Sequence, residues 1–235
     1  SALAALLIRS GAMTDEQEVL IVTLVNSAVD NFTSRIKEFL ELPMPFGYRV
    51  RTLHGLAHDI VREKPAAVGL EERFSIIDDR DAAFILKEAA LAWLSANPDT
   101  LITNYLKPDL DDFQMGRIRR EGLPELVTSI SNAFIRSAKD NRLTPGKLGN
   151  LLEQAPAPLP LAGMGLAIFN DYQRALAYRG AVDFDDLIRL AIDLLERDGE
   201  YLERLRYRWP FILEDEAQDS SRLQEQILRL LTGGS

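Results

Sequence analysis

Two short predicted strands, each followed directly by a helical pattern, are the feature that most restricts how this chain can fold. Residues 19–25 form an unbroken, β-branched run, which is typical of a strand buried on both faces. Residues 49–53 form a second short strand, and helical patterns follow the two strands at residues 26–42 and from residue 54. Because this order is typical of a parallel sheet with crossover helices, we expect an α/β domain.

The alternation of strands and helices stops near Pro65. From residue 78 to about residue 179 the sequence predicts only helices, separated by breaks that contain proline and glycine. One strand returns at residues 210–213, and a polar helix follows it from Ser220. We therefore expect a helix-rich α/β chain in which an all-helical domain interrupts the sheet domain. The expected parts are residues 1–72 and 180–235 for the sheet domain and residues 73–179 for the insert.

The charge of the chain is unevenly distributed. Its formal net charge of −9 argues against a strongly basic nucleic-acid-binding protein on overall balance. Residues 115–147, however, carry seven basic residues against three acidic ones, and residues 183–219 carry twelve acidic residues against five arginines. A polyanion-binding face beside a metal–nucleotide site explains this pattern, and two solvated helix surfaces explain it equally well.

Composition narrows the class of protein further. Cysteine is absent, which excludes disulfides, thiolate metal sites and thiol nucleophiles. The sequence has no run of about eighteen apolar residues, so we expect neither a membrane span nor a membrane partner.

Two adjacent carboxylates end the last predicted strand. An apolar strand that runs into Asp215 and Glu216 projects both from the carboxyl edge of a sheet, where α/β proteins bind ligands. Asp215 can hold Mg²⁺ by way of a water molecule, and Glu216 can orient and deprotonate a water that attacks a γ-phosphate. Acidic residues are also common as simple caps after strands, so the pair alone is weak support for catalysis.

The residues around this pair carry a resemblance. The segment Asp-Glu-Ala-Gln-Asp-Ser at residues 215–220, followed by Gln224, closely resembles the Walker B segment of superfamily 1 DNA helicases of the UvrD/Rep/PcrA type. The continuation Gln218-Asp219 distinguishes it from the DEAD-box RNA helicases. The resemblance implies catalytic roles for Asp215 and Glu216, and implies that Gln218 links the nucleotide site to neighbouring motifs. Glu214 departs from the family, which usually has valine or isoleucine there.

A second segment, residues 21–29, resembles the family's Thr-Phe-Thr-Asn-Lys-Ala-Ala segment, which touches single-stranded DNA. Thr23 and Asn26 fit that pattern and are implied DNA contacts. Leu24 replaces the family's aromatic residue. Since stacking of a base on an aromatic ring is worth about 1–3 kcal/mol, we expect this site to hold DNA less by stacking.

A third segment, residues 51–58, resembles the family's Thr-Phe-His-Gly/Ser-Leu/Phe-Ala segment. Thr52, His54 and the backbone at Gly55 would contact the DNA strand at a helix N-terminus, where free amides favour phosphate. His54 and His58 are four residues apart and would share a helix face. A metal pair is the weaker interpretation, because no third ligand is evident nearby.

A fourth segment, residues 180–188, resembles the Asp-Phe-Asp-Asp turn that leads the family's helical insert back into its motor domain. Its three carboxylates could suggest a metal site. We favour a structural interpretation, in which Asp183 caps a helix and Asp185 and Asp186 lie in its first turn.

The four segments occur in family order, and the resemblance implies a partial RecA-like sheet of the P-loop NTPase class. It further implies ATP and Mg²⁺ as cofactors, single-stranded and duplex DNA as partners, and a cytoplasmic, nucleoid-associated protein. We expect a local basic patch to contribute DNA contacts. The patch residues are Arg117, Arg119 and Arg120.

A phosphate-binding loop of the form Gly-x-x-x-x-Gly-Lys-Ser/Thr is absent from this sequence. The one Gly-Lys pair, Gly146-Lys147, is followed by Leu148 and has Asn141 where the first glycine belongs. We therefore expect a fragment, inactive on its own, of a helicase whose P-loop and second motor domain lie elsewhere in the parent chain. The alternative is a non-hydrolysing DNA- or protein-binding module derived from a helicase.

Overall fold

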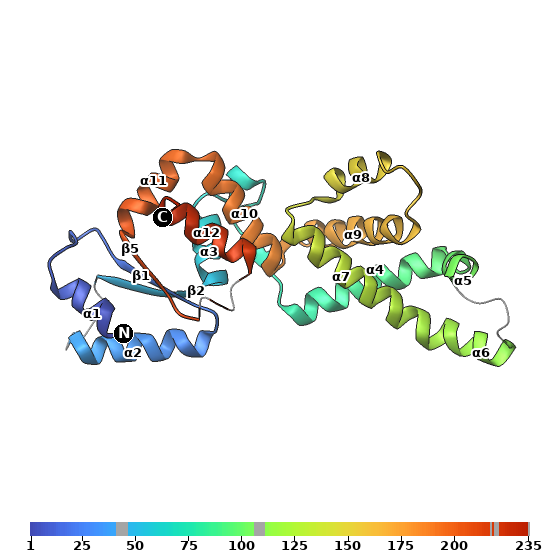
Figure 1. Ribbon diagram of the computed structural model, residues 1–235, viewed down its shortest axis with the longest axis horizontal. Coiled ribbons are helices and arrows are strands. Elements are labelled where there is room, and N and C mark those ends of the chain that lie inside the picture. The colour runs from blue at the N-terminus through green and yellow to red at the C-terminus, as the bar shows by residue number, and fades with distance from the viewer. Residues whose placement is uncertain (41–46, 106–110, 217, 219–220, 235) are drawn as a thin grey trace. The chain divides into compact units, whose positions relative to one another are not determined.

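The computed structural model describes residues 1–40, 47–105, 111–216, 218 and 221–234, and it divides the chain into two compact units. The first unit consists of residues 1–72 and 186–235, and the second consists of residues 73–185 (Figure 1).

A three-stranded parallel sheet forms the centre of the first unit. Strand β1 (Val19–Thr23) lies between β2 (Tyr48–Thr52) and β5 (Phe211–Glu214), and Val19 is in register with Tyr48 and with Phe211. The prediction that these three strands share one sheet is confirmed. All five residues of β1 are buried, as expected for a central strand covered on both faces.

Helices cover both faces of this sheet (Figure 1). On one face, α1 and α2 pack through Ala4 and Ile36 against Val19 and Ile21. The other face is covered by α3, α11 and α12 (Figure 1). The helices of this unit are α1 (Ala2–Arg9), α2 (Asn26–Leu40), α3 (Leu53–Glu63), the 3-10 turn η1 (Pro65–Val68), α10 (Phe184–Arg197), α11 (Gly199–Arg208) and α12 (Arg222–Thr232).

The ends of the predicted strands shift by one or two residues in the structure, and two of these shifts lie where a helix follows. The first strand was expected to reach Val25 but ends at Thr23, where the chain turns into α2. The second was expected to include Leu53, which instead begins α3, because the Thr52 side chain accepts a hydrogen bond from the Gly55 amide and caps the helix. The predicted end of the helix at residues 41–42 lies outside the described residues.

The second unit is built mainly from helices packed around one apolar core. Its centre is formed by α4, α7 and α9, which contribute Ile85, Val127 and Ile168. The helices are α4 (Asp79–Ala96), α5 (Thr100–Tyr105), α6 (Asp112–Arg117), the π-helical turn η2 (Ile118–Gly122), α7 (Leu123–Asp140), α8 (Pro145–Glu153) and α9 (Pro160–Tyr178).

The expectation of an all-helical insert is wrong in one detail. A two-residue strand, β3 (Ser75–Ile76), pairs in parallel with β4 (Ala181–Val182). The Ser75 amide donates to the Gly180 carbonyl at 3.0 Å, which joins the start of this unit to its end. Strands of two residues are too short to show the alternating pattern by which a strand is predicted from sequence.

Close packing of α9 on α7 requires a glycine at position 165. A Cβ atom there would lie 2.6 Å from the ring of Phe134. We expect the steric clash in Gly165→Ala to destabilise this unit by about 1–3 kcal/mol. The greater helix propensity of alanine over glycine, worth roughly 1 kcal/mol, offsets part of this cost. Gly163, in the same helix, has no atom within 4 Å of its Cβ position, so Gly163→Ala should leave stability unchanged or raise it.

Urea unfolding followed by the fluorescence of Trp93, which packs against this core, measures both variants. A Trp209→Phe background removes the other tryptophan of the chain. Equal stabilisation by the two substitutions would show that the helices separate easily at Gly165.

Candidate functional site

The carboxyl edge of the three-stranded sheet brings together the three segments that the sequence singled out. Parallel strands end at the same edge, so the residues that follow them become neighbours. Thr23 and Thr52 are in register at the ends of β1 and β2. The Asp215 amide, just after β5, donates to the Val22 carbonyl at 2.9 Å. Segments about 30 and 190 residues apart in sequence thus meet at one edge.

The two catalytic candidates lie at the end of β5. Asp215 is partly exposed and Glu216 is exposed. Glu216 has a φ of 61°, in the left-handed region that residues other than glycine rarely adopt. Such a conformation costs about 1–3 kcal/mol and is concentrated at functional sites. The Gln218 amide donates to the Glu216 carboxylate at 2.5 Å, which orients it. Ala217, Asp219 and Ser220 lie outside the described residues.

The turn from β2 into α3 holds the clearest group of DNA-contact candidates. Thr52 is the N-cap of α3, and its hydroxyl oxygen accepts the Gly55 amide at 3.1 Å. His54 and Gly55 are partly exposed in the first turn of the helix. A Cβ at residue 55 would lie 3.1 Å from the Thr52 hydroxyl oxygen, so glycine leaves room for this cap. Leu53 is only 1% exposed and therefore cannot stack on a base.

Thr23 and Asn26 differ in accessibility. Thr23 is 1% exposed, and its hydroxyl donates to the Val25 carbonyl at 3.2 Å. Its side chain therefore shapes the turn after β1, and a direct contact with a ligand would require that turn to open. Asn26 is exposed as the first residue of α2.

The predicted basic patch lies in the second unit and is weaker than its charge count suggests. Arg117, Arg119 and Arg120 are exposed on α6 and η2. Arg119 forms an ion pair with Asp99 at 2.7 Å, and the Arg120 Nε donates to the Gly116 carbonyl at 3.1 Å.

Sequence reasoning missed a buried ion pair in this unit. Lys139 was counted among the surface charges but is 2% exposed and pairs with Asp183, which also accepts a hydrogen bond from the Tyr172 hydroxyl at 2.6 Å. Asp183 directly precedes α10, where its capping role stays a prediction, and its carboxylate is bound by Lys139 and Tyr172. A signal was available, because Lys139 continues the four-residue spacing of buried Val127, Ser131 and Ile135 on α7.

A polar cavity of about 260 Å³ lies beside this ion pair. It is lined by Lys139, Asp183 and Tyr172 together with Asn132, Arg136 and Asp185. Burial, and then the negative charge of Asp183, raises the pKa of Asp185 above its ordinary value. Asp186 pairs instead with Arg189 at 3.5 Å.

The described residues offer neither a clustered metal site nor a membrane-spanning helix. In the part of the chain that the structure describes, no three His, Asp or Glu side chains are grouped so that they could hold a metal ion. Within the same residues, no helix combines the length and the apolar character that crossing a bilayer requires.

Comparison with known proteins places these features in a family. The model of the UvrD/REP helicase N-terminal domain matches residues 1–235. The ATP-dependent DNA helicase Rep of Salmonella typhimurium is 28% identical over 217 residues, which cover 92% of this chain and 27% of that protein. Rep of Escherichia coli is 28% identical over 92% of this chain and 28% of its own length. The ATP-dependent DNA helicase PcrA of Leuconostoc citreum is 26% identical over 91% of this chain and 24% of its own length.

The chain thus spans about a quarter of the length of these relatives. A family match over all 235 residues agrees with the sheet order, the acidic pair after β5 and the capped turn after β2. On these grounds, the chain belongs to the UvrD/REP helicase N-terminal domain family.

Proposed function

We propose that this chain is part of the motor of an ATP-dependent DNA helicase or translocase, and that its site is the carboxyl edge of the β2–β1–β5 sheet. The observation that carries the proposal is the meeting of the Asp215–Glu216 pair and the Thr52–Gly55 turn at one edge. A motor that couples hydrolysis to movement on DNA needs its hydrolytic residues and its DNA contacts on one rigid element.

The acidic pair divides the hydrolytic work. Asp215, partly exposed at the sheet edge, offers the carboxylate oxygen that Mg²⁺ favours, and we assign it to the metal through a water. Bound Mg²⁺ would neutralise charge on the nucleotide phosphates. Glu216 orients and deprotonates the attacking water. Gln218 holds the Glu216 carboxylate in place through its amide.

The DNA contacts follow from the first turns of two helices. Thr52, His54 and Gly55 present the N-terminus of α3, where the helix dipole favours a phosphate. The Gly55 amide already donates to the Thr52 hydroxyl oxygen, so the role of this amide is to stabilise the turn. The contacts with DNA then come from other groups of the turn. Asn26 contributes from α2, and Thr23 shapes the turn that presents it.

We assign the parts of the chain by the same resemblance. Residues 1–72 and 180–235 belong to a RecA-like motor domain, and residues 73–179 are its helical insert. The intact parent would supply the phosphate-binding loop and the second motor domain that hydrolysis requires.

A first test uses the 235-residue chain itself. We expect no DNA-stimulated release of phosphate from ATP, because this sequence has no P-loop whose amides and lysine hold the β- and γ-phosphates. A coupled phosphate assay with and without single-stranded DNA measures this. Clear turnover that disappears in Glu216→Gln would show that the chain holds the phosphates by other groups.

A second test concerns DNA binding through the arginines of α6 and η2. Because the chain carries a net charge of −9, binding to DNA must come from a local positive patch that releases counterions. Replacing Arg117, Arg119 and Arg120 with alanine should weaken duplex binding. It should also reduce the slope of log affinity against log salt by about one unit for each phosphate that the variant no longer neutralises.

Fluorescence anisotropy across a salt series measures both quantities. Arg174→Ala is the matched control, since Arg174 is an exposed arginine on α9 of the same unit. If the triple variant behaves like Arg174→Ala, the arginines belong to a solvated helix face or to intramolecular pairs such as Arg119–Asp99. The DNA path would then run elsewhere.

A further inference from the structure

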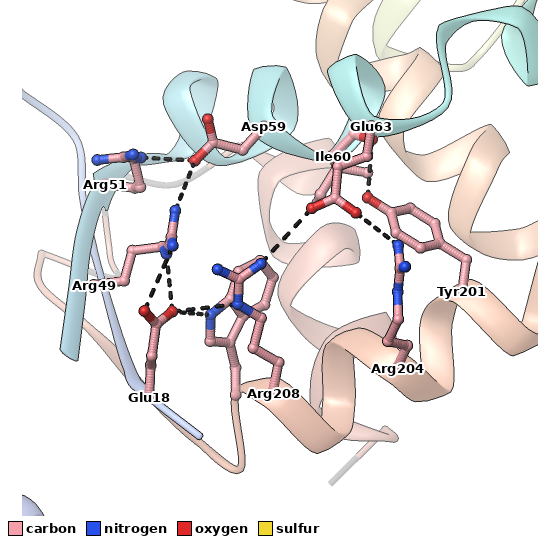
Figure 2. Close-up of polar contacts among 10 residues, drawn as sticks. Glu18, Arg49, Arg51, Asp59, Ile60, Glu63, Tyr201, Arg204 and Arg208 are labelled. Atoms are coloured by element: carbon pink, nitrogen blue, oxygen red, sulfur yellow. Dashed lines mark hydrogen bonds and ion pairs between the residues drawn. The ribbon is translucent and has the colours of Figure 1, made fainter. Parts of the chain in front are cut away.

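A continuous line of ion pairs runs from Arg208, at the end of α11, to Arg51, beside the turn that carries the DNA-contact candidates (Figure 2). Glu18 forms an ion pair with Arg208 at 3.4 Å and accepts a hydrogen bond from Arg49 at 2.9 Å. Arg49 also approaches Asp59 at 3.6 Å, and Asp59 binds Arg51 at 2.7 Å. All five residues lie in the first unit.

Glu18 is the point where the three strands are tied together. It directly precedes β1, Arg49 lies in β2, and Arg208 is the last residue of α11, which leads into β5 through Trp209 and Pro210. The indole of Trp209 also donates to its carboxylate at 3.2 Å. Burial by itself would raise the pKa of Glu18, but the hydrogen bond and charge of Arg49, with Trp209 and Arg208, lower it below the ordinary value. The carboxylate is therefore charged and held in place at neutral pH.

Asp59 connects this point to the DNA-facing turn. Asp59 lies on α3 four residues after Gly55, so both face the same side of the helix. Its partner Arg51 immediately precedes the N-cap Thr52, and the Arg51 Cδ lies 3.5 Å from the Cβ position of Gly55. The Arg51–Asp59 pair thus spans the turn, binding the strand on one side and the helix on the other (Figure 2).

Simple surface stabilisation is the competing explanation. The Arg51 and Asp59 side chains are 39% and 30% exposed, and exposed ion pairs usually contribute little to stability. The same helix provides a comparison, because Glu63 pairs with Arg204 at 2.7 Å and with Arg208 at 3.7 Å and is 39% exposed (Figure 2). Both of these arginines lie on α11, so Glu63 meets the line of ion pairs at its Arg208 end and not at the turn. Glu63 lies at the opposite end of α3 from the turn. The two explanations therefore predict different results for Asp59 and Glu63.

We infer that Asp59 is a positioning residue for DNA binding, which holds the Thr52–Gly55 turn in place and, through Arg49 and Glu18, in fixed relation to the end of α11, from which the chain runs into β5. This inference rests on the proposed function, since it assigns the turn to DNA.

The test compares Asp59→Asn with Glu63→Gln in the 235-residue chain. Each substitution removes one carboxylate charge from α3 and keeps the shape of the side chain. We measure hydrogen exchange of the Gly55 amide by NMR, the affinity for a fluorescent oligothymidylate by anisotropy, and the thermal midpoint. Asp59→Asn should speed Gly55 exchange and weaken the oligonucleotide about three-fold, in line with loss of a partly exposed ion pair. Glu63→Gln should change neither, although the thermal midpoints of the two variants should be similar.

The exchange measurement separates this inference from the proposed function. Unchanged Gly55 exchange in Asp59→Asn, or the same acceleration in Glu63→Gln, would overturn the positioning role. Faster exchange with unaltered affinity would also overturn it, since the turn would then not serve DNA binding. If the unsubstituted chain fails to bind the oligonucleotide, the assignment of the turn to DNA fails first and the positioning role fails with it.

A double-mutant cycle tests the connection through Glu18. If Glu18 acts on the turn by way of Arg49 and Asp59, then Glu18→Gln and Asp59→Asn should be non-additive in their effects on Gly55 exchange. Additive effects would confine the positioning role to the Arg51–Asp59 pair and remove the connection to β5.

Discussion

Replacing Glu216 with glutamine in the intact helicase that we propose as the parent should reduce DNA-stimulated ATP hydrolysis by about 10²–10⁴-fold, the usual contribution of a general base. Glutamine keeps the size of the side chain and can still accept the Gln218 hydrogen bond, but it cannot take a proton from water. Binding of Mg²⁺–ATP should persist, because Asp215 is unchanged. Phosphate release and titration with a fluorescent nucleotide measure the two properties separately.

Glu214→Gln is the matched control for this substitution. Glu214 is an exposed carboxylate two residues earlier, on β5, and is in register with Val22 in the sheet. Its neutralisation should leave turnover within about a few-fold of the parent value, as surface changes usually do. If both substitutions abolish hydrolysis, the loss reflects the negative charge of the whole edge, and the assignment of the base to Glu216 is wrong.

Replacing Lys139 with methionine should destabilise the second unit by about 3–5 kcal/mol. Methionine retains the packing of the stem but removes the ammonium group that pairs with the buried Asp183 carboxylate, and removing one partner of a buried ion pair is costly. The unfolding midpoint in urea, followed by Trp93 fluorescence in the Trp209→Phe background, gives the change in free energy.

The control is Lys147→Met, which removes a lysine that is exposed on α8 of the same unit. It should change the free energy of unfolding by less than about 0.5 kcal/mol. Adding Asp183→Asn to Lys139→Met should recover part of the loss, because the uncompensated charge is then gone. Equal small effects of the two lysine substitutions would mean that Asp183 is solvated after all.

The sheet and its edge could be predicted because local patterns and chain order determine them. The apolar run at residues 19–25 requires burial on two faces, which a central strand of a parallel sheet with helices on both sides provides. The shorter strand at residues 49–53 repeats the order of strand followed by helix that is typical of such a sheet. Once the strands are parallel, their carboxyl ends must meet, so the neighbourhood of Asp215 and Thr52 follows from chain order alone.

The remaining features depend on packing between distant segments. Lys139 and Asp183 are far apart in sequence, and a charge count treats both as surface residues. Thr23 matches a DNA-contact pattern by residue type, but the turn after β1 uses its hydroxyl and buries it. The ion pairs of Glu18 join residues from separate strands and helices, and no local pattern marks such partners.

The short β3–β4 pair has a consequence for how this kind of chain can change over evolution. Because Ser75 and Gly180 are joined by a backbone hydrogen bond, the stretch between them forms a closed loop whose two ends stay together. Insertions and deletions are tolerated best where entry and exit points are adjacent. We therefore expect homologous chains to differ in the length and number of helices between these points, as a cassette that can be exchanged while its attachment points stay unchanged.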